Sequence, residues 1–256
     1  MKKKVVAISD PHCGHLVGLT PPKWQKSIKT KWGLIQYQLW NAYIEMLERQ
    51  KPVDILFVVG DCIDGKGSRS GGTEQITTDR NEQVEMAVRV IREIQAEAIV
   101  MVYGTPYHSG MDEDWERQIA DKVQAKKLGS HEWPEVNGLV FDVKHKIGSS
   151  SIPHGRATPI ERDRLWNFLW TEHEEQPKAD ILIRGHVHYF HFCGEDSWLG
   201  ITLPALQGLG SKFGARQCSG HVDFGLVYFD VEEDGTYSWG WDIARVASQK
   251  ATTIKL

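Results

Sequence analysis

The sequence has no long apolar run, and nothing in it approaches the about 20 consecutive apolar residues that a membrane-spanning helix needs. The basic start, Met1 to Lys4, is followed by only four apolar residues, too few for the core of a secretory signal peptide. The four cysteines show no C-x-x-C spacing, which argues against a zinc ribbon or a redox motif and agrees with a reducing compartment. We therefore expect a cytoplasmic protein that does not enter a membrane.

An excess of positive charge is also missing. The formal net charge is −4 and the pI is near 6.3, so the chain lacks the broad basic field of a protein that grips duplex nucleic acid. Repeats and low-complexity tracts are absent as well. The 256 residues, 41% hydrophobic and 25% charged, have the composition of a soluble globular protein, and we expect a single domain over residues 1–256.

The sequence does contain five short apolar runs that each precede residues able to bind a metal. Residues 5–8 lead to Asp10 and His12, residues 53–59 to Asp61, residues 99–103 to Thr105 and His108, residues 139–143 to His145, and residues 181–183 to His186 and His188. Buried parallel strands read as such runs, and open α/β sheets bind ligands at the carboxyl ends of their strands. Side chains two apart on an extended segment point the same way, so positions 10 and 12, like positions 186 and 188, can direct two ligands into one cleft.

The chemistry of this set indicates a two-metal hydrolase. Imidazole and carboxylate ligands together suit Mn, Fe, Zn or Ni better than Ca or Mg. Two divalent ions held by only two carboxylates would leave the site positive, which favours a phosphate anion as substrate.

At this point the sequence resembles a known family, the calcineurin-like metallophosphoesterases. The family pattern is D-x-H, G-D-x-x-D, G-N-H-D/E, a lone His after a strand, and G-H-x-H. The matching segments are Asp10-Pro-His12, Gly60-Asp61-Cys-Ile-Asp64, a degenerate Gly104-Thr105-Pro-Tyr-His108, His145, and Gly185-His186-Val-His188. The resemblance covers about residues 4–210.

The resemblance implies a fold, a metal site and a mechanism. The fold is a four-layer α/β sandwich of two mixed sheets flanked by helices. One metal, most often Mn, would be held by Asp10, His12, Asp61 and His188, and a second by Asp61, His145 and His186. A hydroxide bridging the metals would attack phosphorus, and His108 would assist the leaving oxygen.

Two assignments within this pattern stay open. Thr105 stands where the family has an Asn ligand, and His108 comes three residues later instead of one, similar to a G-T-x-x-H variant in phage-encoded and bacterial members. Thr105 and Asp64 are therefore candidates either for metal ligands or for hydrogen-bond partners of ligands. His154 competes with His145 for the lone-His position; we favour His145, which follows an alternating strand-like run.

Outside the motifs, alternating strand and helix patterns predict helices near residues 34–49, 82–95, 115–127 and 159–173. Trp166 and Trp170 lie four apart on the last of these and are expected in the core. Residues 14–33 form an insertion, and the strand-rich part from about residue 195 is expected to build the second sheet. Two Gly-rich loops carry Lys66, Arg69, Lys212 and Arg216, which either bind substrate phosphates or have no ligand.

The function predicted from the sequence is hydrolysis of phosphoesters, with phosphodiesters ahead of monoesters and with nucleic acid or nucleotide as candidate substrates. Asp64 is followed by Gly65 where protein phosphatases of the family carry Arg, which disfavours that substrate class. The alternatives are a non-catalytic scaffold that retains the fold and a nucleic-acid-binding accessory protein without turnover. Metal content would separate a two-metal enzyme from a scaffold.

Overall fold

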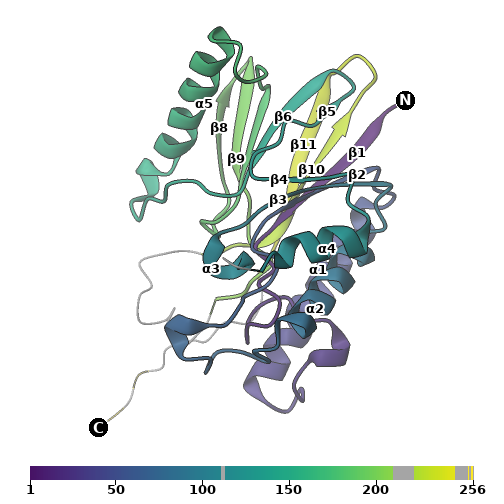
Figure 1. The fold of residues 1–256 in the computed structure, drawn as a ribbon, viewed down its shortest axis with the longest axis vertical. Coiled ribbons are helices and arrows are strands. Elements are labelled where there is room, and N and C mark those ends of the chain that lie inside the picture. Colours follow the sequence, from purple (N-terminus) through teal and green to yellow (C-terminus); the bar gives the residue numbers. More distant parts are fainter. Residues whose placement is uncertain (111–112, 210–221, 246–252, 254, 256) are drawn as a thin grey trace.

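The computed structural model describes residues 1–110, 113–209, 222–245, 253 and 255, and Figure 1 shows two β-sheets with helices on their outer faces. The six-stranded sheet has the order β11-β10-β1-β2-β3-β4 and the five-stranded sheet the order β5-β6-β7-β9-β8. The first sheet comprises β1 (Lys3–Ser9), β2 (Ile55–Val59), β3 (Ala98–Val102), β4 (Lys127–Gly129), β10 (Phe224–Val231) and β11 (Tyr237–Ala244). The second comprises β5 (Glu135–Val136), β6 (Leu139–Lys144), β7 (Ile181–Arg184), β8 (His191–Glu195) and β9 (Trp198–Thr202).

Both sheets are mixed, as expected. Strands β1 to β4 are parallel, whereas β10 runs antiparallel to β1 and β11 antiparallel to β10. In the second sheet β6, β7 and β9 are parallel and β5 and β8 are antiparallel edge strands. The metal-binding motifs follow β1, β2, β3, β6 and β7, so all of them begin at carboxyl ends of parallel strands.

The sheets pack face to face because their strands are apolar on both faces. In β1, Val5 and Ala7 belong to the core between the two sheets, while Val6 and Ile8 belong to the core between the first sheet and its helices. Phe141 of the second sheet packs edge-on against Phe57 of the first sheet, with ring centroids 5.2 Å apart. The parallel strands are thereby held in two layers with their carboxyl ends at one rim.

Helices complete the four layers. The helices α1 (Lys31–Gln50), α2 (Arg80–Glu93) and α4 (Trp115–Val123) contribute side chains to the core on the outer face of the first sheet, and α5 (Ala157–Glu172) packs on β8 and β9 of the second. Short helical turns are η1 (Pro22–Trp24), η2 (Ser68–Ser70), α3 (Pro106–Ser109) and η3 (Pro153–Gly155). The expected sandwich of two mixed sheets flanked by helices is confirmed. None of the helices in the described residues is both long and apolar enough to cross a membrane.

Two details differ from expectation. The C-terminal strands β10 and β11 join the first sheet beside β1, so the expectation that the strand-rich C-terminal part builds the second sheet is wrong for them. Only β8 and β9, of the strands near or beyond residue 195, lie in the second sheet. Trp166 and Trp170, expected in the core, are half exposed on α5.

The predicted insertion begins with buried residues 14–20 and ends at the start of α1, which is capped by the Thr30 side chain.

Candidate metal centre

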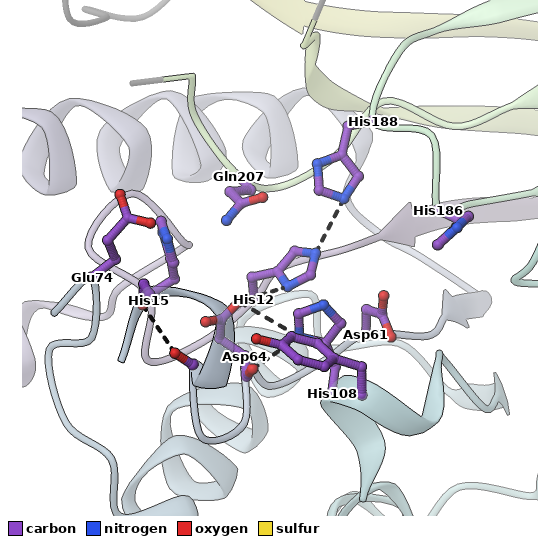
Figure 2. A pocket seen from close by; sticks show the side chains of 12 residues that line it. His12, His15, Asp61, Asp64, Glu74, His108, His186, His188 and Gln207 are labelled. Atoms are coloured by element: carbon purple, nitrogen blue, oxygen red, sulfur yellow. Dashed lines mark hydrogen bonds and ion pairs between the residues drawn. The ribbon is translucent and has the colours of Figure 1, made fainter. Parts of the chain in front are cut away.

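The predicted ligands gather at one rim of the sandwich, from loops of both sheets. Asp10 and His12 follow β1 and Asp61 follows β2, while His145 follows β6 and His186 and His188 follow β7. Figure 2 shows His12, Asp61, His108, His186 and His188 around one cavity. His186 and His188 are half-buried, and the other predicted ligands are buried.

The backbone at these positions is left-handed, which is unusual for residues other than glycine. Nine non-glycine residues among those described have positive φ, and five of them are predicted ligands: Asp10 (52°), His12 (42°), Asp61 (51°), His186 (73°) and His188 (59°). Left-handed non-glycine residues are energetically costly and cluster at functional sites. The backbone is therefore strained directly after β1, β2 and β7, where predicted ligands stand at positions that favour glycine.

The first group of ligand atoms comes from Asp10, His12 and His188. The Nε2 atoms of His12 and His188 lie 3.1 Å apart, and Nε2 of His188 lies 3.1 Å from Oδ1 of Asp10. The other ring nitrogen of His12, Nδ1, lies 3.1 Å from Oδ1 of Asp64, which as a carboxylate accepts its hydrogen. Nε2 of His12 is thus left to face the cluster, and a positive charge between the two Nε2 atoms fits this arrangement.

The second group comes from Asp61, His145 and His186. Nδ1 of His145 donates to the carbonyl of Val59 at 2.7 Å, so Nε2 is directed at the Asp61 carboxylate, with Oδ2 3.1 Å away. Nε2 of His145 is buried and has no hydrogen-bond partner of good geometry. A buried polar atom of this kind needs a proton or a cation beside it, so the donor set fits a metal ion.

Asp61 lies between the two groups. Its carboxylate also forms a cluster with His12 and His108, besides the cluster with His145 and His186. A Cβ on Gly104 would overlap the Asp61 carboxylate, so this position has room only for glycine. The Asp61 carboxylate thus belongs to two of the three groups of potential metal ligands among the described residues.

The cluster attracts positive charge. Burial lowers the pKa of His12, but its hydrogen bonds to Asp10 and Asp64 outweigh that effect and raise the pKa to about 10. Burial likewise opposes charge on His145, yet Asp10 and Asp61 raise its pKa to about 9. Burial raises the pKa of Asp61, but the hydrogen bond and charge of His145 lower it to about 2. A metal ion would replace the protons that these carboxylates favour on the imidazoles.

Thr105 and Asp64 both contact ligands. The backbone N–H of Thr105 donates to Oδ1 of Asp61 at 2.6 Å, and its hydroxyl donates to the same oxygen at 3.1 Å. Asp64 accepts from His12 through one oxygen and from the Gln75 side chain through the other. In this structure each residue is hydrogen-bonded to a predicted ligand, and its role as metal ligand or as hydrogen-bond partner stays a prediction.

The remaining candidates lie in different places. His108 adjoins the cluster, and its Nδ1 donates to the carbonyl of Asp64 at 2.9 Å. His154 lies exposed in η3 and belongs to none of the potential metal clusters among the described residues. Lys66 is exposed and lines a second cavity, whereas the side chain of Arg69, and Lys212 and Arg216 entirely, lie outside the described part of the chain.

Sequence reasoning missed Glu116, a fully buried carboxylate on α4. Its two oxygens accept from the backbone N–H of Cys62 at 3.1 Å and of Gly104 at 2.6 Å, and so tie the loop of Asp61 to the loop of Thr105. Burial and the nearby Asp61 raise its pKa to about 7. A glutamate in the first turn of a helix is ordinary in sequence, so only the tertiary contact identifies it.

A second missed residue is Arg184, which directly precedes Gly185-His186 and is 1% exposed. Its guanidinium bonds Asp142 on β6 at 2.6 Å and Asp163 on α5 at 2.8 Å. The ends of β6 and β7, which carry His145 and His186, are thereby joined to each other and to α5. In the sequence, Arg184 only follows the apolar residues 181–183, and nothing there indicates that Asp142 and Asp163 are its partners.

Two cavities adjoin the cluster. The first, about 290 Å³, is lined by His12, Asp61, His108 and both histidines of the last motif, together with Asp64, His15, Glu74, Tyr107, Gln207, Gly67 and Ser70. The second, about 250 Å³, is lined among others by Lys66, Arg80 and Trp115. Tyr107 and His108 line both, so the two cavities meet beside the metal ligands.

Comparisons with known proteins give only distant similarities. No family model matches the sequence, and no curated protein matches it at a significant level. Among solved structures, an archaeal phosphodiesterase is 14% identical, with a TM-score of 0.46 over 93% of this chain and 99% of the other. Zinc-bound Vps29 from Entamoeba histolytica is 12% identical, with a TM-score of 0.44 over 94% and 98%.

A predicted phosphoesterase from Streptococcus pneumoniae is 12% identical, with a TM-score of 0.40 over 95% of this chain and 99% of the other. Similarities at these identities and TM-scores carry no information about substrate or catalysis. The functional argument therefore depends on the site itself.

Proposed function

We propose that this protein is a phosphoester hydrolase that depends on two divalent metal ions. The observation that carries the proposal is the position of the Asp61 carboxylate, which adjoins ligand groups on both sides. One metal would be held by Asp10, His12 and His188 together with Asp61, which lies close to His12, and the other by Asp61, His145 and His186. The imidazole-rich set favours Mn, with Fe, Zn or Ni as alternatives.

The bound metals would activate a water and offset the charge of a phosphoryl group. The side chains around them have supporting roles. Asp64 holds the His12 ring with Nε2 toward the cluster, and the Val59 carbonyl does the same for His145. The two hydrogen bonds from Thr105 fix the orientation of the Asp61 carboxylate.

We assign His108 to the leaving group. The hydrogen bond from its Nδ1 to the Asp64 carbonyl holds the ring beside the first cavity. Burial and the charge of His12 lower the pKa of His108 to about 4, so the proton for the leaving oxygen comes from Nε2 of the small imidazolium fraction of this ring. We also assign Asp61 a catalytic role, because its carboxylate lies between the two ligand groups and would hold both metals.

The paired cavities favour a phosphodiester. A phosphodiester carries a substituent on each side of phosphorus, and two cavities share Tyr107 and His108 in their lining. Lys66 in the second cavity offers a cation to a further phosphate, and the exposed Tyr107 offers an aromatic face on which a base can stack. A nucleotide or single-stranded nucleic acid fits this lining, with Arg69, Lys212 and Arg216 proposed on sequence grounds as further phosphate contacts.

Hydrolysis of an aryl phosphodiester tests the proposal. The purified protein is stripped with chelator, dialysed and assayed with and without added Mn²⁺, alongside an aryl phosphomonoester at the same concentration. We expect turnover only with metal and a higher kcat/KM for the diester. Equal diester turnover after verified metal removal would contradict the mechanism.

A scaffold without catalysis is the second candidate function. The observation that favours it is the Thr105 hydroxyl, which bonds Asp61 at the position where an Asn ligand is expected. A scaffold has no need for bound transition metals, so absence of stoichiometric metal from protein purified without chelator would support it.

A further inference from the structure

Helix α5 (Ala157–Glu172) is apolar on the side that faces away from the protein. The helix buries only Pro159, Ile160 and Asn167 fully, although it packs against the second sheet. Five large apolar side chains of this helix remain exposed: Leu165 (56%), Trp166 (50%), Phe168 (50%), Leu169 (39%) and Trp170 (42%). In Figure 1, α5 is the outermost layer beside β8 and β9.

Such a surface normally has a partner. Apolar side chains that gather on the exposed side of a helix mark interaction sites on soluble proteins.

The order of residues along the exposed face identifies the partner. Arg162, Leu165, Leu169 and Glu172 are exposed and have spacings of three, four and three residues, which align them in one stripe along the helix. The stripe is symmetric in position about residue 167: Leu165 and Leu169 are equally far from it, and so are Arg162 and Glu172.

We propose that α5 pairs with α5 of a second copy of this chain, antiparallel and around a two-fold axis at the level of residue 167. Two-fold pairing places Leu165 of each copy opposite Leu169 of the other and Arg162 of each copy opposite Glu172 of the other. The leucines of the two copies thus cover one another, and each charged side chain lies opposite one of the opposite sign. Trp166 and Phe168 flank the stripe and widen the contact on its two sides.

The geometry sets the strength of this dimer and leaves the metal centre free. A helix of 16 residues is about 24 Å long, so one helix pair is at the small end of stable interfaces and should associate in roughly the micromolar range. The side chains of the stripe are exposed, whereas the predicted metal ligands follow the carboxyl ends of β1, β2, β6 and β7. Dimerisation should therefore leave both cavities open.

A charge exchange tests the pairing. Sedimentation equilibrium of the full chain over about 1 to 100 µM should show reversible association toward twice 29.1 kDa. Arg162→Glu and Glu172→Arg each place like charges opposite one another at two symmetric positions and should weaken dimerisation about tenfold or more. The double variant with both changes restores the opposite charges and should return to within about threefold of wild type.

Glu45→Arg is the matched control, because Glu45 is an exposed glutamate on α1. It should dimerise like wild type, and circular dichroism confirms that all variants fold. A wild-type chain that stays monomeric at 100 µM, or single charge reversals that leave dimerisation unchanged, would overturn the proposal. Failure of the double variant to recover would equally exclude this antiparallel register.

Discussion

Nε2 of His145 lies 3.1 Å from Oδ2 of Asp61, with both side chains almost completely buried. The Nδ1 hydrogen of His145 is already used in the bond to the Val59 carbonyl. The remaining nitrogen therefore needs a positive charge between itself and the carboxylate, supplied by a proton or by a metal ion. The proposed second metal site is built on this relationship.

The same relationship separates the two lone-His candidates. His145→Ala removes one of three protein ligands of the second group and should reduce bound metal from two ions to one per chain. His154→Ala changes an exposed side chain in η3 and should retain both ions. Elemental analysis after dialysis measures this; loss of metal from His154→Ala, with retention in His145→Ala, would reverse the assignment.

His108→Ala should separate chemistry from metal binding. Removing a group that assists the leaving oxygen typically lowers turnover by about 10²- to 10⁴-fold. Metal content should stay near wild type because the other ligand groups are intact. Steady-state kinetics on an aryl phosphodiester gives the first quantity and elemental analysis the second. Wild-type kcat in this variant would mean that another group acts on the leaving oxygen.

Glu116→Gln should weaken metal binding without touching a ligand. The glutamate accepts two backbone N–H groups with its two oxygens, and a glutamine has only one acceptor oxygen for them. The loops of Asp61 and Thr105 lose part of their alignment, and metal affinity should fall about 10- to 100-fold. Calorimetric metal titration measures the change, with Glu45→Gln on α1 as control. Unchanged affinity would show that the two loops hold their positions without Glu116.

The buried Arg184 network should make folding sensitive to acid. Burial raises the pKa values of Asp142 and Asp163, but the charge of Arg184 outweighs it and holds both below the ordinary value of 3.8. Groups with lowered folded pKa contribute stability above the unfolded pKa, and this contribution is lost as the pH falls through the folded pKa. Stability should therefore decrease below about pH 4.

Arg184→Met leaves two carboxylates near neutral pH without their buried cation, which should cost about 3 to 5 kcal/mol in free energy of unfolding. The difference from wild type should shrink in acid, because without Arg184 burial raises the pKa values of the two carboxyls and protonation then removes their unpaired charge. Urea unfolding at pH 7 and pH 4 measures both, with Arg89→Met on α2 as an exposed control. A loss below about 1 kcal/mol at pH 7 would rule out a structural role for the network.

The places of the ligands could be predicted from the sequence because strand ends and two-residue spacings are local features. Asp10 and His12 lie where an apolar run ends, and the structure brings them together with the last motif. Glu116 and Arg184 could not be found in this way, since their partners are 12 to 54 residues distant in the chain.

Two misassignments have the same origin. Alternation identifies β10 and β11 as strands but says nothing about which sheet they join. Spacing of four places Trp166 and Trp170 on one side of α5, yet the apolar and charged residues of this helix do not separate into two faces, so the sequence does not reveal which side packs on the sheet.

The claim that two metals share Asp61 is tested most directly by metal stoichiometry. Wild-type protein reconstituted with Mn²⁺ and dialysed should retain two ions per chain, and Asp61→Asn, which removes the carboxylate proposed to bind both metals, should retain fewer than one. Asp196→Asn, an exposed change in the turn between β8 and β9, should match wild type. Two ions retained in Asp61→Asn, or fewer than two in wild type at saturating Mn²⁺, would contradict the shared site.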